Sequence, residues 1–145
     1  MSLEIPAFEV APHGGRLVDR VLRGDQLAEA RERVPSLTRL SLNARMMSDV
    51  ELLTVGAYSP LEGFMGETDY RSVLSDMRLA NGLPWPLPIT LAVRKTAADS
   101  LREGQDVALV APWEEPLAIL HLEERSLVVR SGLFANGEHR LGSGG

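Results

Sequence analysis

The spacing of apolar and polar residues in the first half of the chain predicts short helices. Residues 26–34 are rich in helix formers, with Asp25 as the expected N-cap. A second helix, residues 49–55, is predicted by the S-x-x-E capping box that begins at Ser48. Gly56 is expected to end this helix, because glycine adopts the left-handed conformation at little cost.

A third helix is predicted over residues 69–79, with Thr68 as its N-cap. Its apolar residues recur at i, i+3, i+4 and i+7, which places them on one helical face. They are Tyr70, Val73, Leu74 and Met77. A single further helical turn is predicted at residues 99–103, stopped by Gly104.

Other segments have the patterns of β-strands. Residues 37–42 predict a short strand, and residues 89–93 alternate apolar with smaller or polar side chains, as a half-buried strand does. Residues 106–111 and 116–124 flank a turn at 112–115 and predict a β-hairpin. The expected fold class is therefore α+β and strand-rich. Short strands separated by turns favour a barrel or sandwich over βαβ crossovers.

The stretch GAYSPLEGFMGETDY, residues 56–70, joins two predicted helices. It lacks a nucleophile paired with a base, and it lacks the side chains of a phosphate-binding set. It does carry large apolar side chains, which a mobile surface loop would not retain without cost. They are Tyr58, Leu61, Phe64 and Met65. We interpret the segment as a packed connector, with a ligand-binding role as the alternative.

Length and charge limit the classes of function. The chain has 145 residues, 44% of them hydrophobic and 24% charged, which suits one globular domain with a core of its own. Its formal charge of -5 disfavours nucleic-acid binding. The absence of cysteine excludes disulfides and thiolate chemistry. Neither a secretory signal nor a membrane-spanning apolar run is recognisable, so we expect a cytoplasmic protein with no membrane partner.

Few residues are candidates for chemistry. His13, His121 and His139 show no metal-ligand spacing, and His121 is expected to be a structural histidine. The turn at residues 12–15, PHGG, could form an anion-binding nest, but a plain turn is the simpler interpretation. The carboxylate pairs Glu114-Glu115 and Glu123-Glu124 suit solvated edges, because neighbours in a strand point to opposite faces. We therefore predict no catalytic, cofactor-binding or metal-binding residue in this chain.

Residues 49–93 carry a long and irregular match to a known family. They contain the elements GAYSPLEGFM, DYRSV, RLANG and WPLPITL in order. This stretch resembles the N-terminal domain of ATP sulfurylase (sulfate adenylyltransferase), and PHGG and LAILHLEE extend the resemblance over most of the chain. The resemblance implies a PUA-like pseudo-β-barrel decorated by short helices. It also implies a single domain over residues 1–145, with a core at about 12–130 and a tail or interdomain linker at 131–145.

The resemblance further implies a function that this chain does not perform by itself. The family's enzyme transfers the adenylyl group of ATP to sulfate in sulfate assimilation, using ATP with Mg²⁺ and releasing pyrophosphate. Its catalytic Q-x-R-N-P, H-x-x-H and G-R-D segments belong to a following domain, and none of them occurs here. We expect a non-catalytic domain that packs on a catalytic domain or a neighbouring subunit, in an enzyme that can also form homo-oligomers. The alternative is a free-standing PUA-like module with its own ligand or protein partner.

Overall fold

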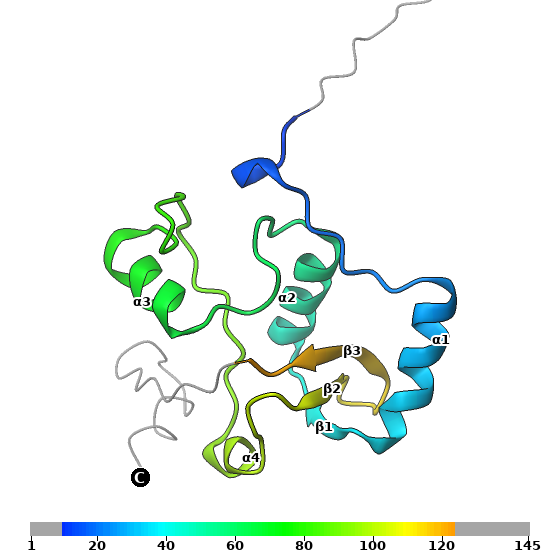
Figure 1. Cartoon of the computed structure of the whole chain (residues 1–145). Coiled ribbons are helices and arrows are strands. Elements are labelled where there is room, and N and C mark those ends of the chain that lie inside the picture. Colours follow the sequence, from blue (N-terminus) through cyan, green and yellow to red (C-terminus); the bar gives the residue numbers. More distant parts are fainter. Residues whose placement is uncertain (1–9, 124–145) are drawn as a thin grey trace, which may run out of the picture.

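The computed structural model describes residues 10–123, in which short helices surround a small sheet (Figure 1). The α+β fold class predicted from the sequence is confirmed. The predicted tail at residues 131–145 lies outside the described residues. The elements, in chain order, are η1 (His13–Gly15), α1 (Gly24–Arg33), η2 (Val34–Ser36), β1 (Thr38–Ser41), α2 (Ala44–Val55), α3 (Glu67–Asp76), α4 (Lys95–Asp99), β2 (Asp106–Val110) and β3 (Pro116–His121).

The sheet has the strand order β1-β2-β3. β2 and β3 pair antiparallel, which confirms the predicted hairpin. β1 and β2 pair parallel, with Leu40 opposite Leu109, and the chain between them passes through α2, α3 and α4. The expectation that crossovers would be absent is therefore wrong, because apolar alternation reports burial and does not report strand direction. The strands within residues 10–123 do not close into a barrel.

The central strand β2 is buried on both faces. Val107, Ala108, Leu109 and Val110 are each at most 2% exposed. Ala108 and Val110 pack with Val34 on one face, while Val107 and Leu109 join a larger cluster on the other. A strand covered on both faces needs a continuous apolar run, which explains the sequence DVALVA.

α2 begins five residues earlier than the capping box predicted. Asn43 is its N-cap, and its side-chain oxygen accepts a hydrogen bond from the Met46 amide at 2.9 Å. Ser48 and Glu51 lie inside the helix, so the predicted capping box is wrong. Asparagine caps as well as serine does, and the earlier cap extends the helix. Gly56 ends α2 in the left-handed conformation with φ of 86°, as expected.

Two other predicted caps are also wrong. Asp25 lies in the first turn of α1, after the extended Arg23, and its carboxylate there complements the helix dipole. α3 has Gly66 as its N-cap, with Thr68 already helical. The helix ends where Met77 turns left-handed, with φ of 54°, earlier than the predicted end at residue 79.

Half of the predicted apolar face of α3 lies in solvent. Tyr70 and Val73 are buried, whereas Leu74 is 45% exposed and Met77 is 59% exposed. The helical turn predicted at residues 99–103 is misplaced, because α4 covers Lys95–Asp99. Gly104 does adopt a positive φ of 84°, in the turn before β2.

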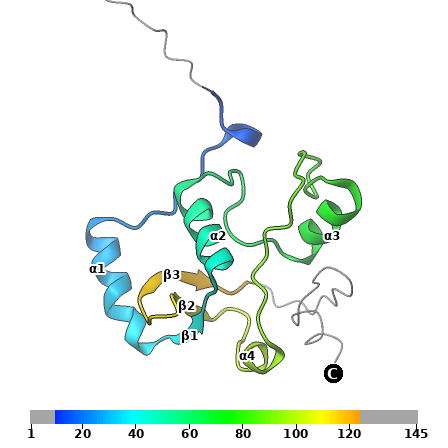
Figure 2. The ribbon, with the colours of Figure 1, turned by 180° about the vertical axis from the view of Figure 1, so that it is seen from behind.

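The predicted strand at residues 89–93 is absent from the sheet. This segment runs without helix or strand structure between the α3 region and α4 in Figures 1 and 2. Ile89 is buried and its carbonyl accepts a hydrogen bond from the Met65 amide at 2.8 Å. Residues 90–93 are all half-buried, so the apolar alternation marks a segment packed against the core that does not join the sheet.

Candidate functional site

The connector between α2 and α3, residues 56–66, is fastened to the N-terminal segment by one buried serine. Ser59 is 4% exposed; its hydroxyl accepts a hydrogen bond from the Val18 amide at 2.9 Å and donates one to the Gly56 carbonyl at 2.7 Å. The following peptide bond, Ser59-Pro60, is cis. Gly56 faces the Val18 carbonyl oxygen so closely that an added Cβ would lie well inside 3.0 Å of it.

The apolar side chains of this connector belong to the core. Leu61 is buried, and Tyr58, Phe64 and Met65 pack against the cluster that includes Leu53, Val73 and Trp85. Phe64 also contacts the cluster that includes Val107 and Leu109, so it joins two of the three core clusters. The interpretation of the segment as a packed connector is confirmed.

Among the side chains of this connector, Tyr58 is the one that most resembles a catalytic group. Its hydroxyl lies 3.4 Å from Oδ1 of Asp49, which is 8% exposed. Burial, and then the nearby Asp49 carboxylate, raise the pKa of the Tyr58 phenol. A phenol whose pKa is raised stays protonated at neutral pH. Tyr58 is therefore suited to donate a hydrogen bond and is poorly suited to act as a base or nucleophile.

The described histidines lie in two different environments. The His13 ring is 2.8 Å from the Pro84 carbonyl oxygen and 5.9 Å from the Trp85 ring. His121 contacts Asp106 on the neighbouring strand. Residues 10–123 hold no group of three potential metal-ligating side chains. His139 lies outside the described residues.

The PHGG segment forms the 3₁₀ turn η1. Gly14 and Gly15 both have positive φ, and the Gly15 amide donates to the Pro12 carbonyl at 2.8 Å. That amide is therefore used within the turn, which favours the plain-turn interpretation over an anion nest.

The carboxylates of the hairpin tip are exposed, as expected for a solvated edge. Glu114 lies 3.1 Å from the Arg39 guanidinium, and Glu115 accepts a hydrogen bond from the Trp113 indole at 2.8 Å. Glu123 is exposed too, and Glu124 lies outside the described residues.

An ion cluster around Asp106 links α1 to the hairpin. The Asp106 carboxylate receives the Arg33 guanidinium of α1 and contacts the His121 ring of β3. The hydrogen bond from Arg33, and then that from His121, lower the pKa of Asp106 below its ordinary value of 3.8. The cluster therefore favours the charged form of this carboxylate in the folded protein.

Replacing Asp106 by asparagine is expected to make the domain less stable at neutral pH and less sensitive to acid. A carboxyl whose pKa is lowered by folding contributes stability above its unfolded pKa, and this contribution is lost as the pH falls through the lower folded value. The stability difference between wild type and Asp106→Asn should therefore shrink as the pH is lowered from 6 towards 2.5. Urea unfolding at a series of pH values measures it.

Asp99→Asn is the matched control for this experiment. It removes the exposed i,i+4 pair of Asp99 with Lys95, a kind of pair worth roughly 0.3–0.5 kcal/mol. A pH dependence as large in Asp99→Asn as in Asp106→Asn would contradict a specific role for the Asp106 cluster.

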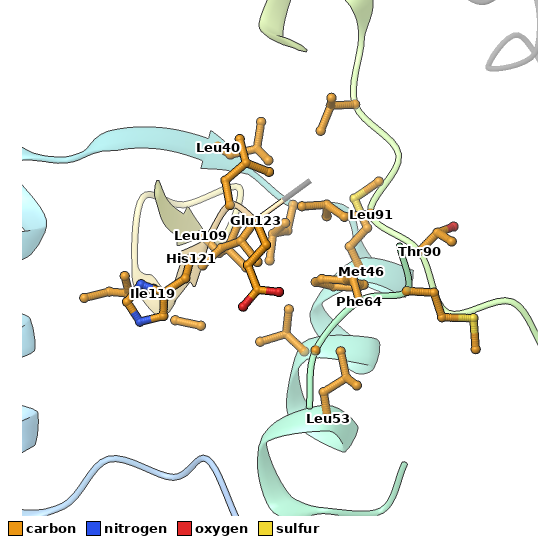
Figure 3. A pocket seen from close by; sticks show the side chains of 18 of the residues that line it. Leu40, Met46, Leu53, Phe64, Thr90, Leu91, Leu109, Ile119, His121 and Glu123 are labelled. Carbon is orange, nitrogen blue, oxygen red and sulfur yellow. The ribbon is translucent and has the colours of Figure 1, made fainter. Parts of the chain in front are cut away.

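A broad apolar groove opens beside the sheet (Figure 3). Side chains from β3, from α2 and from residues 90–99 line it, and Phe64 lies beside Met46 in the view. His121 and Glu123 face it from one side, with Thr90 and Leu91 across from them. Its volume of about 2620 Å³ is several times the roughly 300–1,000 Å³ of a small-molecule pocket. The groove is therefore suited to polypeptide. Sequence reasoning did not predict it, because its walls come from segments distant along the chain.

In comparisons with known proteins, residues 10–128 match the family model of the PUA-like domain. The chain is 53% identical over 119 residues to the sulfate adenylyltransferase of Symbiobacterium thermophilum, which covers 82% of this chain and 30% of that protein. It is 46% identical over 116 residues to a probable bifunctional SAT/APS kinase 2 of Sorangium cellulosum, covering 80% of this chain and 20% of that protein.

Among solved structures, the hexameric APS kinase from Thiobacillus denitrificans superposes with a TM-score of 0.70 at 35% identity. The match covers 78% of this chain and 23% of that one. The chain thus spans about a third or less of the length of each of these relatives.

Proposed function

This chain belongs to the PUA-like domain family, and from that premise we propose that it serves as the non-catalytic N-terminal domain of a sulfate adenylyltransferase. The observation that carries the proposal is its 53% identity over 119 residues to an enzyme of that name, which continues far beyond the shared region. In this proposal the complete enzyme joins ATP and sulfate to give adenosine 5′-phosphosulfate and pyrophosphate, in cytoplasmic sulfate assimilation.

The side chains of the domain support a non-catalytic role. Bringing two polyanions together requires clustered cationic and imidazole donors. Several arginines are already engaged by carboxylates: Arg16, Arg23, Arg33, Arg39 and Arg71. The described residues also offer no set of three potential metal ligands. ATP and Mg²⁺ would accordingly bind to the remainder of the enzyme.

The groove supports packing against further polypeptide. Its size exceeds that of a small-ligand pocket, and it is lined largely by apolar side chains. The relatives provide such polypeptide, because the aligned region is only 30% of the Symbiobacterium thermophilum enzyme. One solved relative is described as hexameric, so contacts with neighbouring subunits are part of the proposal.

The proposal is tested with a chimera in which this chain replaces the aligned 119 residues of the Symbiobacterium thermophilum enzyme. The chimera is expected to release pyrophosphate from ATP and sulfate at a rate within about tenfold of the parent enzyme. The chain alone is expected to release none. A chimera that is insoluble or inactive would favour the free-standing binding module, and turnover by the chain alone would contradict the non-catalytic role.

A further inference from the structure

Residues 91–93 lie between the α3 region and α4 and have no backbone hydrogen-bond partner in the part of the chain that the structure describes. Ile89, just before them, uses its carbonyl to accept from the Met65 amide. In extended chain the backbone groups of successive residues point to opposite sides. A strand added on the side opposite Met65 would accordingly meet the Ala92 N–H and C=O.

The side chains hold this segment in place. Leu91 and Val93 pack against the core cluster under the sheet, and all three residues are half-buried. Half-buried peptide groups without partners carry a cost, and extended chain with such groups is a template for another strand. All three residues line the groove, together with Thr90 and residues 94–99.

We propose that Leu91–Val93 accepts a β-strand from the polypeptide that follows this domain in the sulfate adenylyltransferase relatives. This inference rests on the proposed function. Strand addition satisfies the free backbone groups and fills the groove with alternate apolar side chains. It also explains why an alternating segment that predicts a strand has no strand partner among the described residues.

Two observations favour this occupant. Glu123, which follows β3, lines the same groove as Thr90 and Leu91, so the described part of the chain ends at the groove. The relatives continue well beyond the shared region. Arg94 comes directly after the segment and has no ion pair within residues 10–123, so an acidic residue on the incoming strand would complement it. Nucleic acid is disfavoured by the formal charge of -5.

The test compares amide hydrogen exchange at Ala92 in the isolated chain and in the chimera described above. Exchange is expected to be fast in the isolated chain and at least 100-fold slower in the chimera. Ala92→Pro removes the N–H while suiting extended chain, so it should leave the isolated chain unchanged and lower the melting temperature of the chimera. Ala92→Gly keeps the N–H at the same position and is the matched control; its effect on the chimera should be much smaller.

The outcomes separate this inference from the proposed function. An active chimera with fast exchange at Ala92 and no difference between the proline and glycine variants would overturn strand addition and leave the proposed function intact. An inactive, unfolded chimera would overturn both. Slow exchange at Ala92 in the isolated chain would also overturn the inference. If this protection from exchange increased with protein concentration, the occupant would be a second copy of the chain. If it did not, the occupant would be residues of the same chain.

Discussion

Gly56→Ala is expected to lower the free energy of unfolding by about 2–5 kcal/mol. The residue has φ of 86°, and the left-handed conformation costs a non-glycine residue roughly 1–2 kcal/mol. An alanine Cβ would also meet the Val18 carbonyl oxygen and lie 2.9 Å from Cδ1 of Leu17, and overpacking of this kind costs about 1–3 kcal/mol more. Urea denaturation, monitored by circular dichroism, measures the sum of these two costs.

Gly104→Ala separates the two contributions. Gly104 has nearly the same φ, 84°, but nothing lies within 4 Å of the position of an added Cβ. It should therefore show only the conformational cost of roughly 1–2 kcal/mol. Equal losses in the two variants would mean that the close approach of Gly56 to the N-terminal segment does not contribute.

Trp85→Ala is expected to cost about 3–5 kcal/mol, the range for large-to-small changes of buried aromatic residues. Trp85 is 8% exposed, belongs to the core cluster beneath the connector, and has the Tyr58 ring 6.0 Å from its own in an edge-on arrangement. The cavity left behind would remove support from both the connector and α3.

The second tryptophan of the chain is the matched control. Trp113 lies at the tip of the hairpin and is 65% exposed, so Trp113→Ala should change the free energy of unfolding by no more than about 0.5 kcal/mol. Each variant keeps one tryptophan, so fluorescence reports unfolding in both. Similar losses in the two variants would show that the hairpin tip is packed against something else.

The sequence correctly predicted those elements of the fold that depend on residues close together along the chain. The run DVALVA predicted a strand because the residues on both of its faces are apolar. Gly56 predicted a helix end because glycine tolerates positive φ. Helix starts were less predictable. Asn43 and Ser48 are both good caps a few residues apart, and only the tertiary structure selects between them.

The site depended on contacts between distant residues. Arg33 and Asp106 are 73 positions apart. The alternating pattern at residues 89–93 does not show whether a neighbouring strand pairs with this segment. The family itself was predictable, because the resemblance rests on many residues in register across irregular loops. The groove was not, since its walls are assembled by the crossover between β1 and β2.

That crossover has a consequence for synthesis on the ribosome. Thr38 of β1 pairs with Val107 of β2, and every strand of the sheet borders β2. At the usual elongation rate of about 5–20 residues per second, β1 waits on the order of several seconds for its partner to be translated. Until then, the apolar side chains of β1 and α2 have no strand to cover them. β2 is translated only after the whole crossover, so we expect the sheet to form once β2 has left the ribosome, and chaperones can reach the uncovered β1 and α2 until then.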